Sequence, residues 1–435
     1  MKAVCVCGGV HLPYSPKWYW PVEGFSGTPE PNRYFDMEHI FMRFQETGRE
    51  LLRLNDLLLE SIEGGGKYAL NLSGLFLEQC RWDPELVDSF RDLGESRGVE
   101  FTGNCYYHSL SALYPNPTWF REEVLKHREI SKEMLGAAPE TFVNTELLFS
   151  GKVGKLLSGM GFKCLISEGS SNLTNGYDPA YVYENDLPIL LRHINLSEDL
   201  ELRFSEKDWE GYPLIPEKFA DWINSMDGEV LTLYFNYSSL YFHHRKKSLV
   251  ADFIRELPEK LEERGISMLT PSEVVKSFKP VKLPTLKTEQ TIRYGMHNAL
   301  GNKAQQLYLR ELVQVGEELE EAGRKESPNY GKLKRVFGYL QQGDILFSMK
   351  SGENIREGYE KAVNYYSILS DFRRAVLEES NFPEKRVIPE KKTATAKRTV
   401  TEESPVPEER DIQEKSEGQG KRDIQEKRTV GEEKA

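Results

Sequence analysis

Residues 229–244 read EVLTLYFNYSSLYFHH, a stretch that begins like a buried strand and changes character halfway. Its first seven residues are almost all β-branched, aromatic or apolar, which is typical of a strand covered on both faces. Asn236 then opens a polar cluster, and His243 lies at its far end. Polar side chains directly after a buried strand are typical of an active site, but residues 233–242 contain no carboxylate. The stretch therefore predicts a strand of an α/β fold whose end lacks the acidic group that such sites often use.

Similar apolar runs recur through the first 280 residues, where they alternate with helix-like segments. The strand-like runs are Ala3–Val10, Tyr68–Leu72, Val99–Thr102, Cys164–Ser167, Leu187–Leu191 and Glu229–Phe235. The helix-like segments include Phe41–Glu63, Pro84–Arg97, Trp119–Leu135 and Lys247–Arg264. Strands that alternate with helices over this length predict a parallel α/β sheet or barrel.

Polar residues follow several of these strands rather than precede them. His11 follows the first strand. Asn104, Tyr106 and His108 follow the third, and Glu168 comes directly after the fourth. Because the functional residues of a parallel barrel lie at the carboxyl ends of its strands, we expect these side chains to share one face.

The pattern changes twice toward the carboxyl terminus. From about residue 285 it is helical, and the segments Ala304–Arg324 and Ile355–Glu379 repeat apolar residues three and four apart. Residues 381–435 hold 13 Lys and Arg against 13 Asp and Glu, contain no Leu, Tyr, Trp or Met, and repeat the sequence RDIQEK. So few apolar groups predict a disordered tail, which is a candidate contact for a protein partner. We therefore expect a barrel over 1–284, a helical domain over 285–380 that completes the cleft, and the tail.

Composition excludes several classes of partner. The 435 residues carry a formal charge of −12, which disfavours a nucleic-acid partner, and no apolar run is long enough to span a membrane. The apolar segment at the N-terminus is too short for a secretory signal. Five scattered cysteines without a C-x-x-C pair predict neither a disulfide framework nor a zinc site. A cytoplasmic protein without metal or other cofactor is the expectation.

The candidate site has the composition of a sugar-binding site. A retaining glycosidase needs two carboxyl groups about 5–5.5 Å apart, one as nucleophile and one as acid, with aromatic and polar groups around the sugar. Trp20 follows His11, and Tyr106 stands beside His108. The candidate nucleophile is Glu146, in PETFVNTELLFS, although a solvated surface acid is the commoner fate of an isolated glutamate.

Residues 1–380 resemble glycoside hydrolase family 57, and within it the α-amylase group. The resemblance is carried, in the order of the family's motifs, by VHLPYSPKWYW, GVEFTGNCYYHSL, FVNTELLFS, ALGNKAQQ and LQQGDILFSM. It implies a seven-stranded (β/α) barrel, a retaining mechanism, an α-glucan or maltooligosaccharide substrate and no metal. It also places Glu146 on the family's nucleophile and His243 on a histidine of the acid motif.

The departures from the family bear on catalysis. Its acid motif reads Phe-Met-Asp-Tyr-Glu-Thr-Phe-Gly-Glu-His, whereas residues 234–243 read Tyr-Phe-Asn-Tyr-Ser-Ser-Leu-Tyr-Phe-His. The general-acid Asp is thus replaced by Asn236, and the Glu two residues later by Ser238. Three other sugar-facing positions change, to Leu12, Asn104 and Ile345. Because an amide has no proton to donate at neutral pH, we expect a loss of about 10²–10⁴ in rate.

Two hypotheses follow for the function. One is an α-amylase-like hydrolase or transferase with Glu146 as nucleophile and impaired acid catalysis at Asn236; the other is a catalytically inactive homologue that binds α-glucan or a protein partner. A metal-dependent deacetylase is disfavoured because no His-x-x-x-His occurs. For Glu168 an ion pair with Arg192 is the alternative role, and for Asp344 a helix cap. The predicted substrate contacts are His11, Trp20, Asn104, Tyr106, His108, Glu168, His243 and Asp344.

Overall fold

The central strand of the fold is β1 (Lys2–Val10), which pairs in parallel with β2 (Tyr68–Leu72) on one side and β8 (Val230–Asn236) on the other. Side chains alternate along it, so that Cys5 and Cys7 belong to one buried cluster and Val4 and Val6 to another. The computed structural model describes residues 2–20, 27–170, 178–242, 247–282, 291–350 and 355–380.

Seven parallel strands form a nearly closed barrel. Their order is β7, β8, β1, β2, β3, β4 and β5, and β5 pairs in turn with β7. Two junctions are narrow: Gly103 bridges to Phe142 between β3 and β4, and Arg192 pairs with Thr232 between β7 and β8. The remaining barrel strands are β3 (Val99–Phe101), β4 (Thr141–Val143), β5 (Cys164–Glu168) and β7 (Leu187–Arg192).

Three further strands lie outside the barrel order. The strand β9 pairs with the start of β1, whereas β6 pairs antiparallel with β7 and carries β10 on its other edge. Their bounds are β6 (Val182–Asn185), β9 (Ile266–Met268) and β10 (Val281–Lys282).

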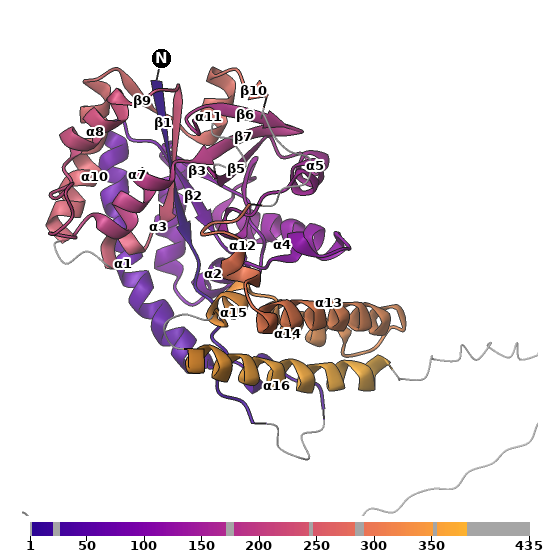
Figure 1. Cartoon of the computed structure of the whole chain (residues 1–435). Coiled ribbons are helices and arrows are strands. Elements are labelled where there is room, and N and C mark those ends of the chain that lie inside the picture. The colour runs from indigo at the N-terminus through magenta and orange to yellow at the C-terminus, as the bar shows by residue number, and fades with distance from the viewer. Residues whose placement is uncertain are drawn as a thin grey trace, which may run out of the picture. The chain divides into compact units, whose positions relative to one another are not determined.

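Helices cover the outside of the barrel (Figure 1). The longest is α1, where Asp36 caps the first turn by accepting a hydrogen bond from the His39 amide, so the helix begins at Met37 rather than at the expected Phe41. The helices of this part are α1 (Met37–Glu63), α2 (Gly74–Cys80), α3 (Pro84–Glu95), α4 (Thr118–Leu135), α5 (Gly151–Gly159), α7 (Ile194–Glu198), α8 (Pro216–Ser225), α9 (Ser239–Phe242), α10 (Lys247–Glu262) and α11 (Pro271–Ser277).

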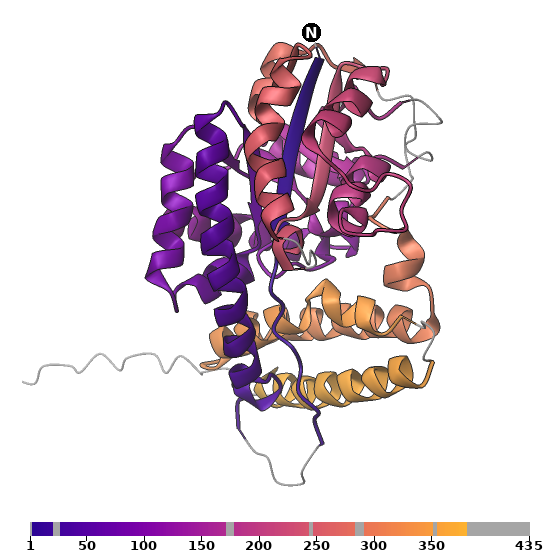
Figure 2. The ribbon, with the colours of Figure 1, turned by 90° about the vertical axis from the view of Figure 1, so that its left-hand side faces the viewer.

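The helices of the C-terminal part lie beyond the carboxyl ends of the strands, toward which β1 runs (Figures 1 and 2). Asn302 and Gln305 form a reciprocal capping box at the start of α13, which explains why that helix begins where the apolar repeat does. The helices are α12 (Met296–Leu300), α13 (Lys303–Arg324), α14 (Tyr330–Leu340), α15 (Gly343–Ser348) and α16 (Ile355–Ser380).

The predicted seven-stranded (β/α) barrel is confirmed, and the helical pattern of the C-terminal part is present. The expected boundary at 284 and 285 and the tail at 381–435 both lie outside the described residues. All five cysteines are buried and free, as their scatter predicts. None of the described helices combines the length and apolar composition needed to cross a bilayer.

The contact of α14 with the barrel can be tested at two glycines of the same helix. A Cβ at Gly338 would come within 2.0 Å of the Tyr107 ring, whereas a Cβ at Gly331 would meet no atom within 4 Å. We expect Gly338→Ala to lower the free energy of unfolding by about 1–3 kcal/mol through overpacking. Gly331→Ala should leave it unchanged or raise it by up to about 1 kcal/mol, because Ala favours helix. Urea unfolding of both variants measures the difference, and equal effects would contradict this packing.

Candidate active site at the carboxyl ends of the strands

Polar residues stand side by side where the barrel strands end. Asn71, Gly9 and Asn236 are register partners across β2, β1 and β8, and Glu168 is the partner of Arg192 across β5 and β7. Because strand side chains alternate, these positions share the inward face on which small apolar residues such as Cys7 lie deeper in the barrel. The strand register thus places Asn236 and Glu168 on the inward face, and the expectation that His11, Asn104, Tyr106 and His108 share this face stays a prediction.

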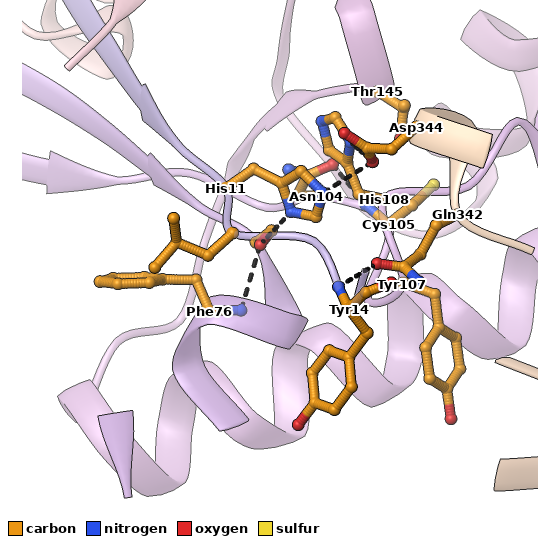
Figure 3. A network of polar contacts seen from close by, with 12 residues as sticks. His11, Tyr14, Phe76, Asn104, Cys105, Tyr107, His108, Thr145, Gln342 and Asp344 are labelled. Carbon is orange, nitrogen blue, oxygen red and sulfur yellow. Dashed lines mark hydrogen bonds and ion pairs between the residues drawn. The ribbon is translucent and has the colours of Figure 1, made fainter. Parts of the chain in front are cut away.

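His11, His108 and Asp344 form one connected cluster (Figure 3). The Nδ1 atom of His11 lies 2.9 Å from the hydroxyl of Ser73, and its Nε2 atom lies 2.9 Å from Oδ2 of Asp344. The same carboxylate oxygen lies 3.7 Å from Nδ1 of His108, a contact too long for a hydrogen bond. The two imidazole rings stack with centroids 3.9 Å apart.

The cluster shifts the pKa values of its two histidines in opposite directions. Burial and the neighbouring His108 lower the pKa of His11, although Asp344 opposes them. Burial also acts to lower the pKa of His108, but Asp344 and Glu146 outweigh it and the pKa is raised. Burial acts to raise the pKa of Asp344, yet the two imidazoles hold it well below its ordinary value. The pKa values of the two imidazoles around this one carboxylate are thus moved in opposite directions.

His11, His108 and Asp344 also have donor atoms within 4.8 Å of one another, a spacing that a metal ion needs. Imidazole lone pairs lie in the ring plane, however, and two planes inclined by only 22° and stacked do not meet near the donor atoms. In this arrangement the two rings are not disposed to hold one ion together.

Asp344 reaches the barrel because α15 is fastened to it at its first residues. Gln342 accepts a hydrogen bond of 2.7 Å from the Tyr14 amide and bridges to Ser109 through the backbone. The Gly343 amide donates to the His108 carbonyl at 2.9 Å. The main chain next to Asp344 is therefore held against the barrel independently of the contacts that its carboxylate makes.

Glu146 lies on a strained turn after β4. Its backbone is left-handed at φ 47° and ψ 36°, and Leu147 follows at φ 56°. Non-glycine residues in this region cost about 1–3 kcal/mol each and cluster at functional sites. Asn144 stabilises the turn by accepting from the Thr145 amide at 3.0 Å and donating to the Leu148 carbonyl at 2.9 Å. The turn is thus built to hold Glu146 in one place.

A second segment clamps this turn from outside. Phe149 and Thr291 form a reciprocal antiparallel bridge, and the Arg293 amide donates to the Glu146 carbonyl at 2.8 Å. The Arg293 side chain is buried and ion-paired with Glu201. Burial acts to lower the pKa of Arg293, but Glu201 and then Glu146 raise it, so Glu146 lies within the field of this guanidinium.

Asn236 is engaged with its neighbours. Its Oδ1 atom accepts hydrogen bonds from the Ser238 amide at 3.1 Å and from the Ser238 hydroxyl at 2.7 Å. Its carbonyl accepts from the Ser239 hydroxyl at 2.7 Å. These bonds turn the chain from β8 into α9 and use the oxygen of the side chain as an acceptor.

Glu168 and Arg192 form the buried pair that the sequence left as an alternative. Their closest atoms are 3.2 Å apart, and the Arg192 Nε donates to the Tyr234 carbonyl at 2.8 Å. Burial raises the pKa of Glu168 although Arg192 and Arg293 oppose it. The pair joins β5, β7 and β8 at the narrow β7–β8 junction, and its role toward a substrate stays a prediction.

Among the described residues, the other predicted contacts make no hydrogen bond or ion pair with His11, His108 or Asp344, although Asn104 is drawn beside them in Figure 3; one of these contacts lies outside the described residues. Asn104 is buried and bonded to Asn71 and to the Cys105 amide. The Tyr106 hydroxyl donates to Glu78 at 2.8 Å. Trp20 is 76% exposed, on a segment that Asn364 of α16 holds through the Tyr19 amide. His243 lies outside the described residues.

Sequence reasoning missed four residues that the structure adds to the site. Ser73 and Gln342 are uncharged and carry no spacing signal. Arg293 and Glu201 meet across 92 residues of chain, a separation that a single sequence does not reveal.

Comparison with known proteins adds to this geometry. The model of the family described as glycosyl hydrolase family 57 matches residues 10–287. A protein named "Putative alpha-amylase" from Methanocaldococcus jannaschii is 30% identical over 348 residues, which cover 74% of this chain and 74% of that protein.

Solved structures show the same fold at low identity. The GH57-type branching enzyme from Pyrococcus horikoshii superposes with a TM-score of 0.60 at 12% identity, covering 87% of this chain and 94% of that chain. The α-amylase AmyC from Thermotoga maritima gives a TM-score of 0.56 at 10% identity, covering 87% and 96%.

The contribution of Asp344 to stability should depend on pH. Its folded-state pKa lies below that of an unfolded Asp, about 3.9, so its stabilisation is complete above that pH and is lost as pH falls further. We expect Asp344→Asn to lower the free energy of unfolding by about 1–2 kcal/mol at pH 7, since solvent reaches a third of the side chain. The difference from the wild type should narrow between pH 4 and pH 2.

Asp88→Asn is the matched control for this prediction. Asp88 pairs with Arg91 on the surface of α3 and is 66% exposed, so its loss should cost about 0–1 kcal/mol. A cost for Asp344→Asn no larger than for Asp88→Asn would show that the histidine cluster does not stabilise the fold.

Proposed function

The chain belongs to glycosyl hydrolase family 57, and we propose that it acts on α-glucans through Glu146 as a nucleophile, with acid catalysis impaired at Asn236. The observation that carries this proposal is the strained, doubly clamped turn that presents Glu146 at the carboxyl ends of the strands. Strain of this kind persists where the surrounding structure fixes it, and it is a feature of catalytic groups. His11, His108 and Asp344 supply donors and acceptors that suit the hydroxyls of a sugar.

The reaction would proceed in two steps. The Glu146 carboxylate attacks the anomeric carbon, the bond to the leaving oxygen breaks, and a glycosyl ester forms. Water, or the hydroxyl of a second sugar, then attacks the same carbon and releases the carboxylate. The first step needs a proton on the leaving oxygen and the second needs a base, and the amide of Asn236 provides neither. Substrates whose leaving groups depart as stable anions should therefore react with Glu146, and the glycosyl ester should accumulate.

The contacts of Asn236 favour a second candidate function, the binding of α-glucan without turnover. Both the amide and the hydroxyl of Ser238 donate to its side-chain oxygen. The same donors would stabilise the ionised form of an Asp at 236 and so lower its pKa, which would make it a poor acid. Asn236 is thus part of a turn, whereas His11, His108 and Asp344 still offer polar groups to a sugar.

Substitution at position 236 tests the proposal. With an aryl α-glucoside that carries an activated leaving group, the wild type should give a burst and a covalent adduct on Glu146, detected by mass spectrometry. Azide, which attacks without needing a base, should restore turnover as glycosyl azide. On maltooligosaccharides, Asn236→Asp should raise kcat about tenfold. The double variant Asn236→Asp with Ser238→Ala, which also lacks the Ser238 hydroxyl, should raise kcat further, toward the 10²–10⁴-fold gain expected of a general acid.

Two controls make the outcome decisive. Glu146→Gln should abolish the adduct, and Asn224→Asp, the same chemical change on the exposed end of α8, should leave every rate as in the wild type. Cleavage of maltooligosaccharides by the wild type at a rate that Asn236→Asp does not change would refute the impaired-acid assignment. Glucan binding without adduct or turnover would favour the second candidate.

A further inference from the structure

We propose that Cys105 is a positioning residue, whose thiol couples the turn that presents His108 to the turn that presents Glu146. The coupling runs through Asn144, the residue that shapes the Glu146 turn. The inference rests on the proposed function only in calling Glu146 a nucleophile. The coupling itself can be measured without turnover.

Cys105 is held by both of its main-chain groups. Its amide donates to Oδ1 of Asn104 at 2.7 Å, and Nδ2 of Asn104 donates to Oδ1 of Asn71 at 2.9 Å. The Cys105 carbonyl accepts from the His108 amide at 3.1 Å, which closes a β-turn. Cys105 is thus tied to the end of β2, and it begins the turn that carries His108 into the histidine cluster (Figure 3).

The thiol of Cys105 reaches the other turn. Its Sγ atom lies 3.3 Å from Oδ1 of Asn144. The same oxygen accepts from the Thr145 amide at 3.0 Å, and Nδ2 of Asn144 donates to the Leu148 carbonyl at 2.9 Å. Because a backbone amide and a backbone carbonyl fix which end of the Asn144 side chain is the oxygen, the thiol is the donor in this contact.

Burial keeps this donor protonated. Cys105 is fully buried, and burial raises the pKa of its thiol; Glu123 adds to the rise, while the hydroxyl groups of Ser111 and Thr145 oppose it. The thiol therefore carries its proton at physiological pH and donates it to Asn144. An enclosed thiol of this kind is a poor nucleophile, so the role of Cys105 is to hold Asn144 rather than to react.

The contact lies at a narrow junction of the barrel. Gly103 joins the end of β3 to β4 through two backbone hydrogen bonds of 2.8 and 2.9 Å. Beyond this bridge the two chains are joined by side chains, namely the Cys105 thiol and Oδ1 of Asn144. Loss of this bond would free Asn144 to turn, and Glu146 would shift relative to His108.

The relative position of these two turns would govern the rate of reaction. Under the proposed function His108 contacts the sugar and Glu146 attacks it, and an error of about 1 Å in such a position can cost about 100-fold in rate. A thiol is a weak donor, so its loss should cost less, about 3–10-fold. The cost should fall on the reaction step rather than on sugar binding, because the histidine cluster keeps its own contacts.

The direct test is amide hydrogen exchange at Thr145, measured by NMR on the full chain. In Cys105→Ala the Asn144 side chain loses the thiol donor, and we expect exchange at Thr145 to speed up about 2–10-fold, the value of one hydrogen bond. Cys105→Ser keeps a donor and should exchange as the wild type does. The matched control is Cys80→Ala, which removes an equally buried thiol from the end of α2 and should leave Thr145 unchanged. Equal exchange in the two alanine variants, or faster exchange in Cys105→Ser as well, would overturn the inference.

A trapping experiment separates this inference from the proposed function. A ring-fluorinated α-glucosyl fluoride, whose leaving group needs no proton, should label Glu146 in the wild type. In Cys105→Ala the limiting rate of labelling should fall about 3–10-fold while the half-saturating concentration changes less than about twofold, and Cys105→Ser should restore the rate. A limiting rate that Cys105→Ala leaves unchanged contradicts the role of Cys105. Absence of labelling in the wild type contradicts the proposed function, and the hydrogen exchange at Thr145 then still decides the inference.

Discussion

The contact of Asp344 with His11 and His108 is the interaction on which the arrangement of the site depends. It joins three parts of the chain, namely the end of β1, the segment after β3 and the first turn of α15. The Asp344 side chain is 36% exposed, and its contacts with the two rings add to the bonds by which Gln342 and Gly343 already hold α15 against the barrel. His108, which stacks on His11, has a left-handed backbone at φ 52°. These contacts hold the C-terminal helices against the carboxyl ends of the strands.

Much of the remaining polarity of the barrel is neutralised in pairs. Glu168 with Arg192 and Glu201 with Arg293 are both buried, and such pairs add little net stability because desolvation offsets their attraction. Their effect is to fix geometry. Each ties a strand end or a following loop to its neighbour, and together they leave Glu146 as a carboxylate that has no hydrogen-bond partner among the described residues. The backbone is strained at Glu146, and under the proposed function this strained turn would hold the reacting carboxylate in place.

The sequence predicted the fold better than the site. Strands of five or more residues, such as β1 and β8, carry a readable apolar run, and so the barrel and its helices were predictable. The strand β4 has only three residues, Thr141–Val143, too few for any period to show, although Glu146 depends on it. Residues that follow strands, such as His11, were predicted by that rule, and the structure places His11 in the cluster with His108 and Asp344. Arg293 was missed because its partner lies far away in the chain. Trp20 was predicted from its neighbours in sequence; it is 76% exposed, and its role stays a prediction.

The two narrow junctions divide the barrel into unequal halves. One half holds β8, β1, β2 and β3, and the other holds β4, β5 and β7. Within the described part of the chain, Gly103–Phe142 and Arg192–Thr232 are the only strand pairs between the halves. Glu146 follows a strand of the smaller half, whereas Asn236 and His11 end strands of the larger one. The separation between Glu146 and Asn236 is therefore set where few backbone pairs join the strands. The buried pair of Glu168 with Arg192, whose Nε also bonds the Tyr234 carbonyl, fastens one of these two junctions.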